Sequence, residues 1–159
     1  MNTKRFITVA SALAVSLALP LGGAVKASEF FAAQSQGGAA SADLIVKVEN
    51  IDKTEGQLRI GLYDSETGFE DDRELRGQTV PVTGSTMRII FDDLPVGRYA
   101  IKVFHDQDTD GSLDKDFMGI PSEPYGFSNN ASDPFSAPEW KETRFALPRG
   151  QMTQSIDLG

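Results

Sequence analysis

The chain has 159 residues, of which 40% are hydrophobic and 24% charged, and it contains no cysteine. This length fits one ordinary globular domain, and the lack of cysteine excludes a small fold held together by disulfides. The formal net charge is -8, from 15 Lys and Arg against 23 Asp and Glu. Because an acidic chain repels nucleic-acid phosphate, we expect no nucleic-acid partner.

The first 27 residues have the pattern of a secretory signal peptide. Lys4 and Arg5 precede an apolar stretch over residues 6–19, and small residues then lead to a cleavage site after Ala27. About 14 apolar residues are too few to span a bilayer as an uncleaved anchor. We therefore predict a periplasmic or secreted protein that is not inserted in the membrane after signal cleavage. Cleavage removes three basic residues and no acid, so the formal charge of the mature chain is -11.

The mature chain is predicted to comprise a flexible linker, residues 28–41, and one domain, residues 42–159. The linker is small and polar with no apolar period, whereas apolar residues recur at every second position from Ala42 onward. Such alternation is typical of strands with one buried face. We expect seven strands, at about residues 44–48, 58–62, 78–82, 86–91, 99–105, 142–147 and 152–158.

The connections between these strands predict an all-β fold. A hairpin is the simplest link between the first two strands, and Pro81 marks residues 78–82 as an edge strand. The acidic segment over residues 63–77 leaves room for at most a short helix. We predict an antiparallel two-sheet β-sandwich, of the immunoglobulin-like or prealbumin-like type, with one long ordered loop between the fifth and sixth strands. A small barrel is the alternative.

The long loop begins with a run of regularly spaced acids. The run Asp-x-Asp-x-Asp-Gly starts at Asp106, so carboxylates occupy positions 1, 3 and 5 of a calcium-type loop and Gly111 permits the sharp turn at position 6. Hard oxygen ligands favour calcium over zinc. We predict a calcium site formed by Asp106, Asp108, Asp110, Ser112, Asp114 and Asp116. The alternative is an Asp-rich turn whose carboxylates accept hydrogen bonds from their own backbone.

The run departs from the EF-hand pattern at position 12. Phe117 stands where a bidentate Glu should close the coordination sphere, and the flanking segments have no helical period. The first half of the loop resembles the DxDxDG calcium loops of dockerins and thrombospondin-type repeats. By this resemblance, Asp114 or Asp116 would supply the closing carboxylate.

The remainder of the loop combines aromatic and amide side chains. Such side chains suit the binding of a glycan, or of a peptide or protein segment, but a packed loop could use the same aromatics as its own core. The candidate ligand-binding residues are His105, Tyr125, Phe127, Asn129, Asn130 and Trp140.

Catalysis is the less favoured reading of the chain. His105 is the only histidine, and neither a cysteine nor a G-x-S-x-G nucleophile motif accompanies it. We therefore expect a non-catalytic binding module. The alternatives are a small periplasmic hydrolase that uses His105 or the loop acids, and a structural envelope protein without a ligand.

Two motifs carry a resemblance to a known family. The run GIPSEPYGFSNN, residues 119–130, follows the DxDxDG loop, and L-P-x-G-x-Y, residues 94–99, precedes it. The chain thereby resembles a family of secreted bacterial proteins known as the domain of unknown function number twenty-one forty-one. The resemblance extends from about Leu44 to Leu158. It implies a secreted or periplasmic β-sandwich and no established activity.

Overall fold

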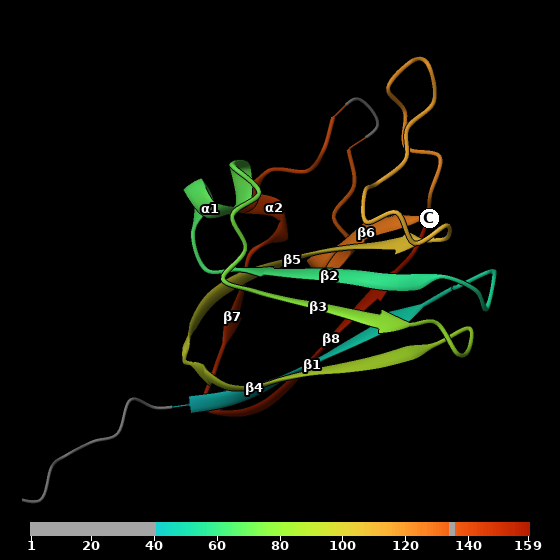
Figure 1. Cartoon of the computed structure of the whole chain (residues 1–159). Coiled ribbons are helices and arrows are strands. Elements are labelled where there is room, and N and C mark those ends of the chain that lie inside the picture. The colour runs from blue at the N-terminus through green and yellow to red at the C-terminus, as the bar shows by residue number, and fades with distance from the viewer. Residues whose placement is uncertain (1–40, 134–135) are drawn as a thin grey trace, which may run out of the picture. The chain divides into compact units, whose positions relative to one another are not determined.

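In the part of the chain that the structure describes, the alternating segments form eight strands in two stacked sheets (Figure 1). The computed structural model describes residues 41–133 and 136–159, so the predicted leader and nearly all of the predicted linker lie outside the described residues. The strands are β1 (Ser41–Glu49), β2 (Gln57–Tyr63), β3 (Arg76–Pro81), β4 (Met87–Pro95), β5 (Gly97–Asp106), β6 (Tyr125–Phe127), β7 (Phe145–Leu147) and β8 (Gly150–Asp157).

The predicted two-sheet sandwich is confirmed. One sheet has the order β4-β1-β8, and the other has the order β3-β2-β5-β6, with β7 pairing to the first part of β5. The edge position expected for residues 78–82 is also found, because β2 is the only described strand that pairs with β3. The prediction of a wholly antiparallel arrangement is wrong in one place, since β1 and β8 are parallel over residues 42–49 and 150–157.

Three further details differ from the sequence-based expectations. β1 and β2 belong to different sheets and form no hairpin; Ile51, which follows β1, is only 3% exposed and its amide donates to the Ser85 carbonyl. Residues 140–143 form a short helix, so the strand expected over 142–147 shortens to β7. The long loop contains β6, which raises the strand number from seven to eight.

The inner faces of the two sheets enclose the main hydrophobic core. Alternate residues of each long strand contribute to it, and burying each of these side chains stabilises the fold by about 1.5–3 kcal/mol. Its fully buried members include Leu44, Val46, Val48, Leu58, Leu62, Leu94, Ile101 and Ile156. Because successive strand residues point to opposite faces, the alternate positions of β2 and β5 face outward and are free to build a site.

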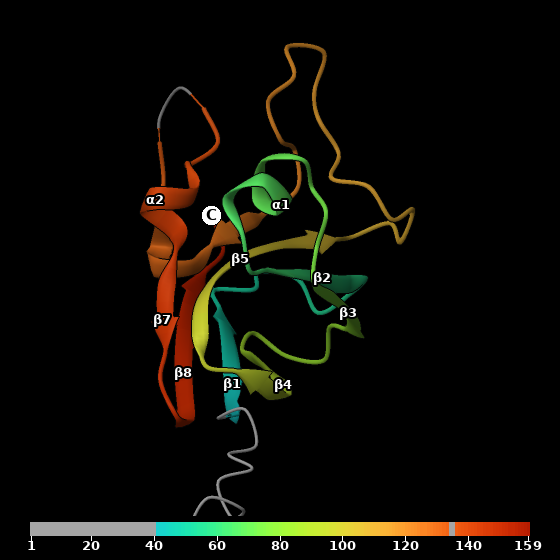
Figure 2. The ribbon, with the colours of Figure 1, turned by 90° about the vertical axis from the view of Figure 1, so that its left-hand side faces the viewer.

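Two short helices cover one end of the outer face of the larger sheet (Figure 2). Helix α1 (Glu66–Glu70) begins after Ser65, whose side chain accepts from the Gly68 amide, and helix α2 is Trp140–Thr143. Phe69 of α1 packs on Trp140 at a ring-centroid distance of 5.9 Å. A short 3₁₀ turn, η1 (Ser128–Asn130), follows β6. Within the described ranges, no helix has the length and apolar character that crossing a membrane requires.

Candidate metal centre

Strand β5 ends by placing two polar residues on opposite faces of the larger sheet. His105 shares the inward face with Ile101 and Val103, whereas Asp106 points to the outer face. Asp106 has no exposed surface, and its Oδ2 accepts hydrogen bonds from Gln57 Nε2 at 2.8 Å and from the Gly111 amide at 3.1 Å. The first acid of the loop is therefore held rigidly at the end of a central strand.

The turn predicted at Gly111 is present. Gly111 has φ +90°, a region that glycine adopts without a steric penalty, and Thr109 has φ +65°. Asp108 Oδ1 accepts from the Asp110 amide at 3.1 Å, and Asp110 Oδ1 accepts from the Ser112 amide at 2.7 Å. These local bonds are the backbone-satisfying turns that the sequence left as an alternative, and they leave the second oxygen of each carboxylate available.

Three carboxylates converge at the base of the loop, and the sequence indicated only two of them. Asp106, Asp108 and Glu123 each offer one oxygen, and these oxygens lie within 4.8 Å of one another. Glu123 is 7% exposed and accepts from the amides of Gln107 at 2.7 Å and Asp114 at 3.2 Å. The chain returns here to begin β6, and this return brings Glu123 back to the start of the loop.

Asp106 carries an oxygen that has nothing to bind. Its Oδ1 is buried and lacks a hydrogen-bond partner, and among side-chain atoms of the described residues only His105 Nδ1 shares this condition. Burial acts to raise the pKa of Asp106, but the hydrogen bonds from Gln57 and Gly111 to Oδ2, the nearby Thr109 amide and the charge of Arg59 outweigh it and lower the pKa. A buried ionised oxygen without a partner is costly, and a bound cation would satisfy it.

Asp114 lies in the field of the same acids. Partial desolvation raises its pKa, and the negative charges of Asp108, Asp110, Glu123 and Asp106 raise it further. The raised pKa of Asp114 therefore reflects partial desolvation together with the crowding of like charges at the base of the loop. Asp110 and Ser112 are exposed on this loop.

Asp116 lies near the tip of the loop and is engaged there. Its Oδ1 accepts from the amides of Met118 at 2.8 Å and Ile120 at 3.0 Å. Phe117, at the twelfth position, is 98% exposed. The carboxylate of Asp116 thus accepts hydrogen bonds within the tip of the loop. The carboxylate that lies beside Asp106 and Asp108 is that of Glu123.

His105 is fully buried between the sheets. Its Nε2 lies 2.7 Å from the Glu55 carbonyl, which accepts the bond when Nε2 carries a proton. Its backbone amide donates to the Pro124 carbonyl. The side chain supports the chain beside the metal centre and has no exposed surface.

A family model matches the part of the chain that contains the acidic loop and Glu123. The model of the family described as "Uncharacterized protein conserved in bacteria (DUF2141)" matches residues 46–155. The chain belongs to this DUF2141 family. The resemblance stated from the two sequence motifs is thereby confirmed. No curated protein and no solved structure matches the chain.

The aromatic ligand candidates of this DUF2141 domain lie mostly inside the fold. Phe127 and Trp140 join Tyr63 and Phe69 in a second buried cluster, and the half-buried Tyr125 ring stands edge-on to Phe127 at 5.9 Å. Most of these rings therefore pack inside the fold, as in the alternative in which the loop uses its aromatics as its own core. Tyr125 also borders open clefts.

The two amide candidates bind neighbouring segments. Asn129 Nδ2 donates to the carbonyls of Glu142, Thr143 and Arg144, and its Oδ1 accepts from Gln154 Nε2. Asn130 Oδ1 accepts from the Asp157 amide at 2.9 Å. Both residues have positive φ, +63° and +50°. Their amides fasten η1 to α2 and β8.

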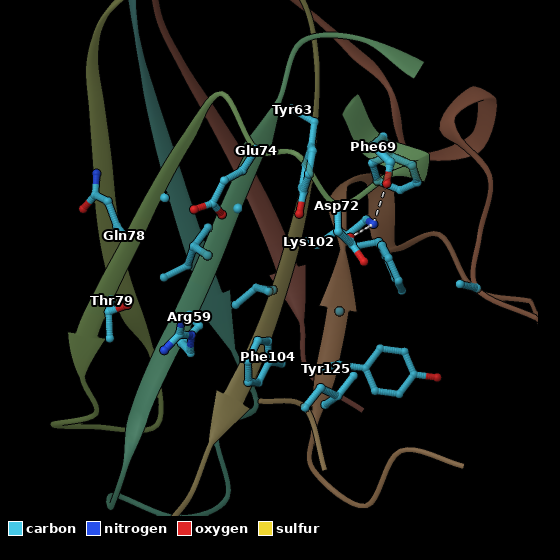
Figure 3. A pocket seen from close by; sticks show the side chains of 18 of the residues that line it. Arg59, Tyr63, Phe69, Asp72, Glu74, Gln78, Thr79, Lys102, Phe104 and Tyr125 are labelled. Carbon is cyan, nitrogen blue, oxygen red and sulfur yellow. Dashed lines mark hydrogen bonds and ion pairs between the residues drawn. The ribbon is translucent and has the colours of Figure 1, made fainter. Parts of the chain in front are cut away.

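A cleft that sequence reasoning missed crosses the outer face of the larger sheet. It has a volume of about 740 Å³, and Gly111, Leu113 and Lys115 of the acidic loop form part of its wall. Figure 3 shows this cleft from close by. Arg59, Phe104 and Tyr125 lie across its floor, which the alternation of β2, β5 and β6 could have indicated. The cleft and the metal centre thus share one loop.

Proposed function

We propose that this DUF2141 protein is an exported, non-catalytic β-sandwich module that binds one calcium ion at the base of its acidic loop. Asp106, Asp108 and Glu123 supply the central carboxylates, and Asp110 and Asp114 lie close enough to contribute electrostatically. The buried, unpartnered Oδ1 of Asp106 is the observation that carries the proposal. Bound calcium would hold the start and the end of the loop together, because Asp106 and Glu123 lie at its two ends.

The donor set favours calcium over the common alternatives. Among the described residues, the group whose ligand atoms converge here consists of three carboxylates and includes no histidine or cysteine, so it forms a hard oxygen site, which suits calcium or magnesium and not zinc. The irregular loop also suits calcium, which accepts six to eight oxygens in flexible geometry, whereas magnesium demands a near-ideal octahedron. Water and backbone carbonyls would complete the shell. We expect a Kd of about 10⁻⁴ to 10⁻³ M, typical of extracellular modules.

A non-catalytic role fits the position of the only histidine. His105 has no exposed surface and faces the main core, so a substrate would not reach it without opening the sandwich. A hydrolase that used His105 would therefore lack a base at the surface, and only the version that uses the loop acids keeps exposed groups. Export is supported by the leader pattern over residues 1–27, and mass spectrometry of the protein from fractionated cells should find a mature N-terminus at Ser28.

Thermal melting tests the calcium proposal. The melting temperature of the wild-type domain should rise on going from EDTA to millimolar calcium, and magnesium should raise it less. Calcium at 100 times the Kd should add about 2.7 kcal/mol to the free energy of unfolding. Asp108→Asn, which changes an exposed proposed ligand, should lose the calcium-dependent rise in melting temperature. The matched variant Asp92→Asn, at an exposed position of β4, should keep it. Identical wild-type melting curves in calcium and EDTA would overturn the proposal.

A further inference from the structure

The cleft owes its shape to one transverse row of side chains and one pair of glycines. Thr79, Arg59, Phe104 and Tyr125 are direct neighbours across β3, β2, β5 and β6. In the next row, Gly77 pairs with Gly61 and leaves two strands without side chains, so the surface is hollow there. Figure 3 shows the four side chains of the first row spread along the floor of the cleft.

The end of the cleft away from the acidic loop carries the carboxylate of Glu74. A Cβ on Gly77 would lie 2.2 Å from Glu74 Oε1, and a Cβ on Gly61 would lie 2.8 Å from the Tyr63 hydroxyl, so both polar groups rest over the glycine pair. Lys102 is already occupied: its ammonium donates to the Phe69 carbonyl, pairs with Asp72, and lies 4.3 Å from the Phe69 ring centroid. Lys102 therefore fastens α1 to the sheet and offers no free charge to a ligand.

The end of the cleft next to the acidic loop carries two cations, Arg59 and Lys115. Arg59 is half-buried, and in the described part of the chain no group accepts a hydrogen bond from its guanidinium or forms a close ion pair with it. A Cβ on Gly111 would lie 2.9 Å from Arg59 Nη1, so the turn of the acidic loop packs directly on this guanidinium. The exposed Lys115 lines the same end. A half-buried guanidinium with free donors is suited to a carboxylate.

We propose that this cleft binds a sugar that carries a carboxylate, with the carboxylate on Arg59, and that calcium in the acidic loop strengthens the binding. The rings of Phe104 and Tyr125 offer apolar surface for a sugar ring beside Arg59. Thr79 and Glu74 offer hydrogen-bonding groups for hydroxyls along the cleft. The calcium dependence rests on the proposed function, whereas the choice of ligand rests on the cleft itself.

Charge at the shared loop explains the coupling. Arg59 interacts electrostatically with Asp106, and Asp108, Asp110, Asp114 and Glu123 gather around the same point. In the absence of a cation, this group of acids opposes the approach of a ligand carboxylate to Arg59. A bound divalent ion removes most of that repulsion, so ligand affinity should rise with calcium occupancy, and calcium affinity should rise with ligand by the same factor.

Calorimetric titration of the whole mature chain with two probes tests the inference. Glucuronate should bind in calcium buffer, and methyl glucoside, which has the ring but no carboxylate, should bind at least tenfold more weakly. The affinity for glucuronate should fall at least tenfold in EDTA. Arg59→Gln should cause a similar loss in calcium buffer, while Arg88→Gln, on the exposed face of β4, should leave binding unchanged.

Melting curves of the same samples separate this inference from the proposed function. Arg59→Gln should keep the calcium-dependent rise in melting temperature, which shows that the metal centre and the fold are intact. Equal binding of glucuronate by wild type and Arg59→Gln would overturn the inference, as would equal binding of the two sugars. If calcium raises the melting temperature and glucuronate does not bind, the cleft proposal fails and the calcium proposal stands. Glucuronate binding that EDTA does not weaken would overturn the coupling.

Discussion

Gln57 Nε2 donates a 2.8 Å hydrogen bond to Oδ2 of Asp106, the residue directly opposite it across β2 and β5. This bond helps to keep Asp106 ionised and fixes its carboxylate at the mouth of the acidic loop. Gln57→Leu should lower the free energy of unfolding by about 1–3 kcal/mol at neutral pH, since Asp106 then loses a buried donor. Chemical denaturation would measure the loss, and Gln151→Leu, an exposed position of β8, is the matched control.

The effect of Gln57→Leu should also depend on pH. The pKa of Asp106 in the folded state lies below the ordinary value of 3.8, so its contribution to stability is present above that value and is lost as the pH falls through the lowered pKa. The difference between wild type and Gln57→Leu should therefore be complete at pH 6 and should shrink below about pH 4. A difference that grew with acidification would refute this role for the bond.

Asp114 should show the opposite pH dependence. Partial desolvation and the neighbouring acids raise its pKa above the ordinary value of 3.8, so its ionisation destabilises the calcium-free fold. Below 3.8 the wild type and Asp114→Asn should have equal melting temperatures in EDTA. As the pH rises from 3.8 through the raised pKa, the variant should become the more stable of the two. Calcium should narrow the gap, and a variant less stable than wild type at neutral pH in EDTA would contradict this reading.

Gly56 lies against the backbone of Asp106 and Gln107, where the acidic loop begins. Its φ is +67°, and an added Cβ would lie 2.3 Å from the Asp106 carbonyl oxygen and 2.7 Å from Gln107 Cα. Since both neighbours are backbone atoms, Gly56→Ala should cost at least about 2 kcal/mol of stability and should weaken calcium binding. Gly84→Ala is the control, because its Cβ would meet nothing nearer than 3.8 Å. Equal melting temperatures for the two variants would show that the close approach is unimportant.

Asn129 should prove to be a structural residue. Its side-chain amide satisfies three carbonyls around the end of α2, and its φ is +63°. Asn129→Gly tolerates this φ, so its cost of about 1–3 kcal/mol would report the lost amide. Asn50→Gly, at φ +59° with a single exposed hydrogen bond, should be nearly neutral. A neutral Asn129→Gly would favour the alternative in which Asn129 serves a ligand.

The sequence predicted the strands better than their partners. Alternation identifies a buried face without naming the neighbour, and the parallel pairing of Val46 with Gln154 joins segments more than 100 residues apart. The segment after β1 looked like a turn because it is polar, yet the apolar Ile51 within it signals a chain that stays in the core while it crosses between sheets. Residues 140–143 became helical because Glu139 and Glu142 form a capping box, a local signal that the strand-like run after them obscured.

The acidic loop could be predicted in its first half only. Asp106, Asp108 and Gly111 follow a local spacing, and the structure brings Asp106 and Asp108 together and turns the chain at Gly111. Asp110, the third acid of that spacing, is not among the three converging carboxylates. Glu123 follows no spacing from these acids and reaches them through the return of the chain into β6. Its one sequence signal is its position between Pro121 and Pro124, inside the motif that carries the family resemblance.

The central claim is a single calcium site that Glu123 closes and Asp116 does not. Calorimetric titration of calcium into wild type, Glu123→Gln and Asp116→Asn tests it most directly, since the two variants change the charge of the loop equally. The account predicts one ion per chain for wild type and Asp116→Asn, and an affinity at least tenfold weaker for Glu123→Gln. Wild-type affinity in Glu123→Gln, or loss of binding in Asp116→Asn alone, would contradict it.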